Sequence, residues 1–289
     1  RLPVEPGIPG VVHILDPHCY RCPFGQEPES CRRECIAHVE QIIRFEGPEN
    51  VAALLIEGVT GTSGIIVPPD DYWPRLREIC DRYGILLIAD EVMSGFGRTG
   101  EWFAVNRWGV VPDMITMAKG LTSGYLPLGA VIVSEPIAAY FEDHMFWGGL
   151  TYSSHPMSCA AAIATLQVYE EEKLLEHTRQ MERVMADGLA DLQDRHPCVG
   201  DVRGLGLFWV LELVKDRETR EPLVPWNARP DELGPMPALT RFTRERGLYT
   251  FNKWNWIFLI PPLPITADQI AEGLAVIDEA LKIADEFVR

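Results

Sequence analysis

Hydrophobic and polar residues follow one another along the chain in blocks that switch between helical and strand-like spacing. Apolar residues recur every three to four positions in some stretches, and short continuous apolar runs separate them. In the clearest pair, a helix predicted at 70–83 ends at Gly84, and an apolar run at 85–89 follows. Such a run is typical of a parallel strand that is covered on both faces. The alternation predicts an α/β fold with a mostly parallel sheet.

The same reading extends over the rest of the chain. It predicts strands at 51–57, 85–89, 114–117 and 128–133, and helices at 36–45, 70–83, 136–142, 157–171 and 174–195. It then predicts short strands at 199–203, 207–214, 248–251 and 257–260, a proline-rich loop at 222–237, and helices at 238–246 and 267–288. We therefore predict a large domain at 1–175, incomplete at its N-terminus, and a small C-terminal α+β domain at 176–289.

Composition narrows the function classes. The chain has 289 residues, 47% of them hydrophobic, and a formal net charge of −16. Such an acidic surface repels phosphate backbones, so we expect no nucleic-acid partner. No apolar run of about 18 residues occurs, so we expect no membrane span. Residues 1–6 have no signal-peptide pattern, and the seven cysteines are an odd number, which together predict free thiols and a cytoplasmic protein. The start without methionine suggests a fragment.

Four of the cysteines lie close together in the loop predicted at 1–35. They are Cys19, Cys22, Cys31 and Cys35, with gaps of two and three residues inside the pairs. Four thiolates at these gaps are compatible with a tetrahedral structural zinc site. The alternative is a loop of unligated thiols that proline and glycine shape, and the sequence leaves both open.

Two residues stand just after predicted strands. Asp90 ends the most apolar run of the chain, and Lys119 follows the short strand at 114–117. Ligands of open α/β sheets bind at the carboxyl ends of strands, so an acid and an amine are predicted in one crevice. An apolar run before Asp90 and Glu91 also fits the Walker-B strand of an ATPase. That hypothesis requires a phosphate-binding loop, which this sequence lacks.

Several short motifs around these residues occur in a fixed order. They are DEVMSGFGRTG at 90–100, PD at 112–113, AKG at 118–120, PLGA at 127–130, GGLTYSSHP at 148–156, VRGLGL at 202–207 and PPL at 261–263. In order and spacing they closely resemble the class III aminotransferases over nearly the whole chain. The resemblance implies a fold-type-I transferase that depends on pyridoxal 5′-phosphate (PLP).

The resemblance also implies roles for individual residues. Lys119 matches the lysine that holds PLP as a Schiff base and then moves the substrate proton. Asp90 matches the carboxylate that bonds the ring nitrogen and keeps it protonated. The other matching positions are Val92 on one face of the ring, Met93 beside the ring hydroxyl where many relatives have glutamine, Glu57 near the substrate, and Thr151 as a phosphate ligand for the neighbouring subunit of a homodimer.

The implied reaction moves an amino group from an amine or ω-amino acid to a keto acid such as pyruvate. The segments 20–25 and 57–61 resemble members that use ω-amino acids, taurine or β-alanine. Some members bind the substrate carboxylate with an arginine soon after PPL, where this chain has Ala267, so Arg98 or another arginine is expected instead. Two alternatives stay open: an aminomutase of the same family, and a truncated, non-catalytic chain. The second is considered because relatives have a longer N-terminal region, with a Gly-Ser phosphate cup and a stacking aromatic ring.

Overall fold

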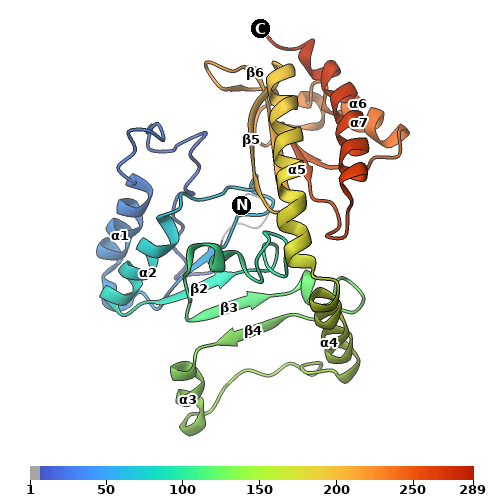
Figure 1. The fold of residues 1–289 in the computed structure, drawn as a ribbon. Coiled ribbons are helices and arrows are strands. Elements are labelled where there is room, and N and C mark those ends of the chain that lie inside the picture. Colours follow the sequence, from blue (N-terminus) through green and yellow to red (C-terminus); the bar gives the residue numbers. More distant parts are fainter. Residues whose placement is uncertain (1–6) are drawn as a thin grey trace.

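The computed structural model describes residues 7–289, so the predictions for residues 1–6 lie outside its description. Its first sheet contains four strands in sequence order, and Figure 1 shows those that it labels lying side by side. The four strands are β1 (Ala53–Glu57), β2 (Leu86–Asp90), β3 (Met114–Met117) and β4 (Ala130–Val133). The first three strands are parallel and β4 is antiparallel to β3. The predicted α/β class with a mostly parallel sheet is therefore confirmed for this part of the chain.

Helix α2 (Tyr72–Tyr83) leads into β2 as the sequence predicts. Gly84 ends it in the left-handed conformation, with φ 68°, and the Gly84 N–H donates to the carbonyl of Cys80. Asp71 stands at the N-cap of this helix. That carboxylate makes no cap hydrogen bond and instead accepts from Arg33 Nε at 2.6 Å, so an ion pair ties α2 to the start of α1 (Glu34–Glu46).

The two faces of the first sheet differ in burial. On one face, Leu87 and Ala89 are fully buried against apolar side chains of α2. The register places Leu55 and Val131 on the opposite face, and they are 59% and 60% exposed. Within residues 7–289, the prediction of two covered faces is therefore confirmed for the face that packs against α2 and not for the opposite face. The exposed face is also the one that carries the side chain of Asp90.

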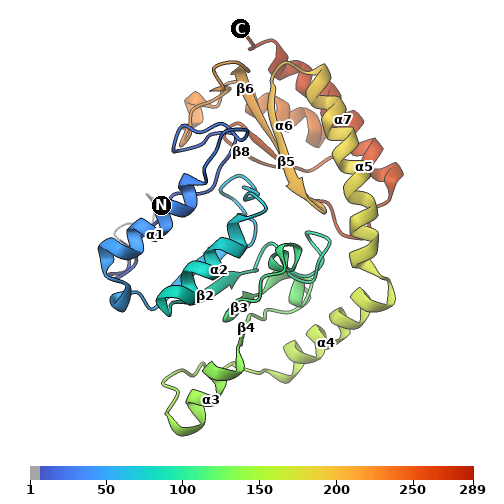
Figure 2. The ribbon, with the colours of Figure 1, turned by 60° about the vertical axis from the view of Figure 1, so that its left-hand side comes forward.

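Shorter elements complete this part. They are η2 (Pro48–Asn50), η3 (Ala104–Trp108), η4 (Lys119–Leu121), α3 (Glu135–Asp143) and α4 (Pro156–Glu171). Figure 2 shows α3 and the segment after it projecting beyond β4 before the chain returns through α4. None of the helices within residues 7–289 has the length and apolarity needed to cross a membrane.

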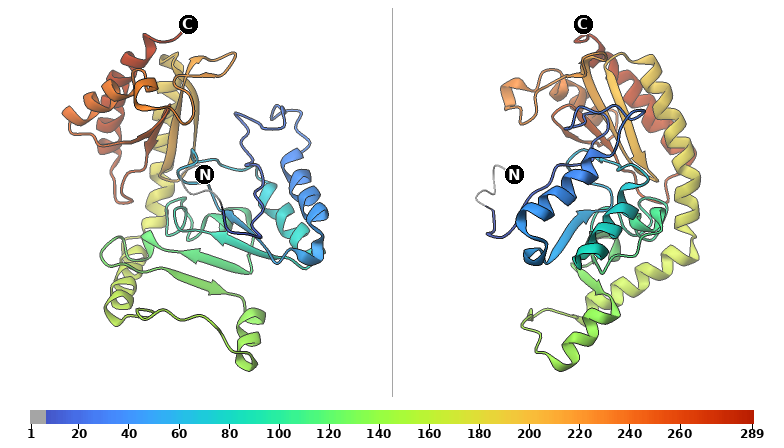
Figure 3. Two further views of the ribbon diagram at one scale, coloured as in Figure 1. Left: turned by 180° about the vertical axis from the view of Figure 1, so that it is seen from behind. Right: turned by 90° about the vertical axis from the view of Figure 1, so that its left-hand side faces the viewer.

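The second sheet is wholly antiparallel. Its elements are β5 (Val199–Leu205), β6 (Phe208–Asp216), β7 (Glu221–Pro222), β8 (Phe251–Lys253) and β9 (Trp256–Leu259), with η5 (Pro230–Glu232) and the helices α5 (Leu174–Arg195), α6 (Met236–Glu245) and α7 (Ala267–Asp285). Figure 3 shows the long α5 and the C-terminal α7 lying along this sheet.

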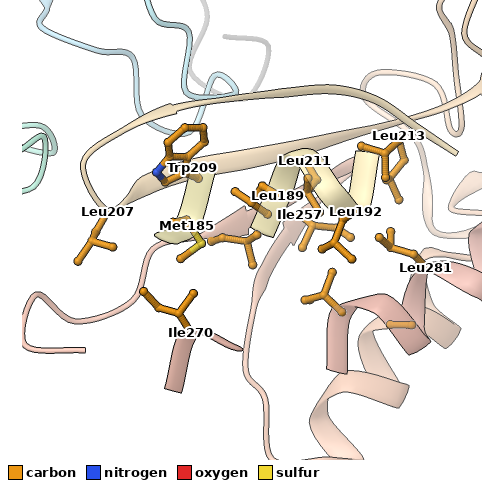
Figure 4. Packing of buried hydrophobic residues seen from close by; sticks show 14 of the residues in the cluster. Met185, Leu189, Leu192, Leu207, Trp209, Leu211, Leu213, Ile257, Ile270 and Leu281 are labelled. Atoms are coloured by element: carbon orange, nitrogen blue, oxygen red, sulfur yellow. The ribbon is translucent and has the colours of Figure 1, made fainter. Parts of the chain in front are cut away.

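The main core lies between this sheet and its helices. Figure 4 shows Met185, Leu189 and Leu192 of α5 facing apolar side chains of β6, β9 and α7. The same cluster of buried residues also includes Met117 and Leu121, from the end of the first sheet. Because one core crosses residue 175, the boundary between a domain at 1–175 and a domain at 176–289 stays a prediction.

Candidate active site

Three charged residues meet where the parallel strands end. Glu57 ends β1 and Asp90 ends β2, and the register pairs Glu57 with Asp90 and Asp90 with Thr116 of β3. Lys119 follows Thr116 by three residues. Neighbouring strands lie ~4.8 Å apart and three residues span at most ~10 Å, so the Cα atoms of Asp90 and Lys119 are at most ~15 Å apart. The predicted meeting of acid and amine is thus present in the fold.

Asp90 has one carboxylate oxygen free of protein partners. The N–H of Val92 donates to its Oδ1 at 3.0 Å, and no residue within 7–289 donates to Oδ2. The turn after Asp90 is held by Glu91, which is fully buried and accepts from Ser94 Oγ at 2.6 Å and from the N–H of Val105 at 2.9 Å. Burial raises the pKa of Glu91, although these hydrogen bonds lower it in part. The buried network of Glu91 fixes the turn after Asp90. Asp90 Oδ2 can therefore accept a hydrogen bond from a ligand.

Lys119 has a fixed backbone and a free side chain. It is exposed, and its ammonium makes no ion pair or hydrogen bond with any residue that the structure describes. Its φ of 38° lies in the left-handed region, which costs a non-glycine residue about 1–3 kcal/mol and is typical of functional sites. The next residue must be small, because a Cβ at Gly120 would lie 2.7 Å from Phe96 Cβ.

Glu57, at the end of β1, lies beside Asp90 on the side away from β3. Its Oε2 accepts from the N–H of Gly61 at 2.7 Å, which closes the loop after β1. Burial raises the pKa of Glu57, the Gly61 hydrogen bond lowers it, Asp90 and Asp16 raise it further, and Lys119 opposes them. These charges therefore act on one another within a single site.

The other predicted site residues divide into two groups. Val92 and Met93 are half-buried in the turn after Asp90, and a Cβ at Gly61 would lie 2.1 Å from Met93 Sδ, so Met93 lies against the loop of Glu57. Thr151 is exposed in the projecting segment between α3 and α4, with no polar contact to Asp90 or Lys119 among residues 7–289. The fold thus gathers five of the six predicted residues and leaves Thr151 apart from them.

Arg98 has a structural role and is not the expected ligand for a substrate carboxylate. Its Nη1 donates to the carbonyls of Leu207 at 2.9 Å and Pro261 at 2.6 Å. Burial lowers the pKa of Arg98 to about 10. These bonds tie the turn after β2 to the second sheet and to the PPL motif.

The hypothesis of a zinc site is not supported by the cysteine geometry. All seven thiols are free, and Cys19, Cys22, Cys31 and Cys35 line one small cavity. No three of their sulfur atoms lie within 4.8 Å of one another, a distance that only His18, Asp201 and Glu212 satisfy within residues 7–289. Those two acids already bind arginines, because Arg203 lies 2.8 Å from Glu212 and also pairs with Asp201, and Arg21 pairs with Glu212.

Comparison with known proteins gives this geometry a family. The family model for aminotransferase class-III matches residues 3–281. An adenosylmethionine-8-amino-7-oxononanoate aminotransferase of Nitratidesulfovibrio vulgaris is 42% identical over 88% of this chain and 46% of its own length. A putrescine–pyruvate aminotransferase of Pseudomonas aeruginosa is 39% identical over 95% of this chain and 59% of its own length.

A solved structure shows the same fold. It is a taurine:2-oxoglutarate aminotransferase from Bifidobacterium kashiwanohense in complex with PLP and glutamate. It is 41% identical, with a TM-score of 0.90 over 96% of this chain and 62% of that one. The fold is therefore that of a fold-type-I transferase. The chain belongs to the class III aminotransferase family, and it spans about half of the length of the curated relatives it matches.

Proposed function

We propose that this protein is a PLP-dependent aminotransferase that moves an amino group from an amine or ω-amino acid to a keto acid such as pyruvate. One observation carries the proposal: a carboxylate oxygen and an amine, both without partners among residues 7–289, end two adjacent strands. The family and the PLP complex of a neighbour with a TM-score of 0.90 support it.

The residues present fit the cofactor. Lys119 Nζ would attach it, and Asp90 Oδ2, the free acceptor, would take the ring N–H. Val92 would pack on one face of the ring and Met93 would lie beside its hydroxyl. When bound, PLP withdraws electrons from the carbon that carries the migrating amino group.

The chain's own residues then handle the proton. Once the substrate amine has taken its place, Lys119 Nζ would be a free base that takes the proton from the substrate Cα and later gives it up again. The negative charge of Asp90 would favour a protonated ring nitrogen. Glu57 holds the loop at Gly61 beside this centre, because its Oε2 accepts from that N–H at 2.7 Å.

The experiment that tests this function is a half-reaction. The protein loaded with PLP is mixed with an amine donor and no keto acid, and absorbance and products are followed. We expect conversion of PLP to pyridoxamine phosphate, with one equivalent of carbonyl product released per site. An aminomutase would keep its product's amino group, so cofactor recovery without free carbonyl product would contradict the proposal. A non-catalytic chain would give no spectral change.

A homodimer is part of the proposal. The projecting segment between α3 and α4 carries large apolar side chains that are unusually exposed, among them Trp147 at 90%, Leu150 at 80% and Tyr152 at 81%. Thr151 lies between them. In a dimer, it would reach the cofactor phosphate in the site of the partner subunit. Exposed apolar surface of this extent is typical of an interface.

Trp147→Lys is expected to convert the dimer to monomers, because it places a charge in the apolar contact. Light scattering after size-exclusion chromatography measures the mass directly. Phe45→Lys, at a side chain 75% exposed on α1, serves as the control and should stay dimeric. A wild-type protein that elutes as a monomer would refute the dimer and the role of Thr151.

We further propose a cytoplasmic location. All seven cysteines are free, as is usual in reducing compartments. Cell fractionation with detection of the protein checks this, and recovery outside the cytoplasmic fraction would contradict it.

A further inference from the structure

A pocket of about 360 Å³ lies beside the loop that follows β1. It is formed by four segments that are far apart in sequence: the N-terminal segment, the loop after β1, the loop between β7 and η5, and the hairpin of β8 and β9. We call it the Arg21–Lys253 pocket; residues that line it include Asp16, Arg21, Ser63, Trp226, Lys253 and Trp256. None of the functions assigned above uses it.

The pocket shares a wall with the candidate active site. Glu57 binds Gly61, and two residues later Ser63 lines the pocket. From the other side, Lys253 Nζ donates to the carbonyl of Thr62 at 3.0 Å. Asp16, on the pocket lining, also acts electrostatically on Glu57. The loop that follows Glu57 therefore separates the candidate active site from this pocket and contacts both.

The lining offers hydrogen-bond donors that the described residues do not use. Arg21 directs Nε to Glu212 and Nη1 to the carbonyl of Arg220 at 2.6 Å, whereas its Nη2 is buried without a partner. Trp256 Nε1 is also buried without a partner, and this residue is only 4% exposed. A buried donor without a partner is unfavourable, so an acceptor that reached these atoms would be stabilised.

The charges of the lining favour one acid group. Arg21 and Lys253 are cations and Asp16 is the single acid among the lining residues, while His18 is neutral because burial, chiefly, lowers its pKa to about 4. Behind the lining, Glu212 and Asp201 are already engaged by Arg21 and Arg203. The indole rings of Trp226 and Trp256 provide apolar walls for the methylene groups that precede such an acid.

We propose that the Arg21–Lys253 pocket binds the acid group of an ω-amino substrate, a carboxylate or a sulfonate, while its amine end lies at Lys119. This inference rests on the proposed aminotransferase function. It assigns to Arg21 and Lys253 the part that Arg98 does not fill. It also places the specificity of the enzyme in the N-terminal segment and in β8 of the second sheet.

A kinetic comparison tests the specificity. Lys253→Met keeps the length of the side chain and removes its charge. We expect KM to rise about tenfold for 4-aminobutyrate and for taurine, and to stay unchanged for butylamine, because a charge-assisted hydrogen bond is lost only for substrates with an acid group. Lys282→Met, on the exposed face of α7, is the matched control. Equal effects on all three amines, or no effect on the acids, would overturn the proposal.

A binding measurement separates the pocket from the chemistry. The Trp side chains of the pocket give a fluorescence signal, and butyrate, propane-1-sulfonate and butan-1-ol serve as probes. We expect saturable quenching by one or both acids, not by the alcohol, in the wild type and in Lys119→Ala, and its loss in Lys253→Met; the two acids show whether carboxylate or sulfonate is preferred. Cofactor attachment at Lys119 without saturable acid binding would overturn the pocket alone. Acid binding without cofactor attachment would overturn the proposed function and leave the pocket.

Discussion

Replacing Lys119 by alanine is expected to lower kcat by a factor of at least about 10⁴, because one side chain supplies both the covalent attachment and the proton transfer. The fold should be unaffected. The Lys119 side chain is exposed and makes no ion pair or hydrogen bond within residues 7–289, so its removal breaks no described contact. The measurement is kcat for the amine donor and pyruvate, together with the amount of PLP fixed to the protein by borohydride.

Two further variants show why kcat falls in Lys119→Ala. Lys119→Arg keeps the positive charge and cannot attach the cofactor, so it should be as inactive as Lys119→Ala if attachment matters and charge does not. Lys282→Ala removes another exposed lysine, whose ammonium lies 2.6 Å from Glu279, and should keep full activity and labelling. If Lys119→Ala fixes as much cofactor as the wild type, the assignment of this residue is wrong.

Much of the fold could be predicted because local patterns and tertiary packing agree. The strand at 114–117 and the helix at 174–195 are found with the predicted limits, since each presents a continuous apolar surface to the core. The strand predicted at 248–251 is instead Phe251–Lys253, paired with β9. Its turn uses Trp254 with φ 54°, a residue that gives no turn signal in sequence. The pairing partner, and not local propensity, sets this strand.

The parts of the candidate site that lie at strand ends could be predicted from the sequence. Asp90 and Lys119 each come directly after a strand, and parallel strands end at one edge, so the sequence alone indicates their meeting. The Arg21–Lys253 pocket could not be found this way, because its walls come from segments near residues 21, 63, 226 and 253. Arg98 was misjudged for a related reason: its two carbonyl partners, at Leu207 and Pro261, lie more than 100 residues away.

The ATPase hypothesis can now be set aside. The class III aminotransferase family matches residues 3–281, which include the apolar strand and Asp90. The structure also explains why an acidic pair follows this strand. Glu91 points away from the site into a buried network with Ser94 and Val105, so only Asp90 is available to a ligand.

Replacing Asp90 by asparagine is expected to lower kcat roughly 10²–10³-fold, the range typical of losing one preorganised electrostatic group in an active site. The variant keeps its shape, since the asparagine oxygen still accepts from the N–H of Val92, as Oδ1 does at 3.0 Å. The substitution changes the atom at the Oδ2 position. An amide NH₂ in the place of Oδ2 donates a hydrogen bond, so it favours a ring nitrogen without a proton.

The pair of outcomes separates binding from chemistry. Asp90→Asn should still fix PLP to Lys119, with an altered absorbance spectrum and slow proton transfer from the substrate Cα, because an unprotonated ring withdraws electrons poorly. Asp113→Asn is the matched control: Asp113 binds Arg77 at 2.7 Å and precedes β3, at the opposite edge of the same sheet. It should cost stability and leave kcat unchanged. If Asp90→Asn turned over at the wild-type rate, its carboxylate would not face the ring nitrogen, and the strand-end site would need another ligand.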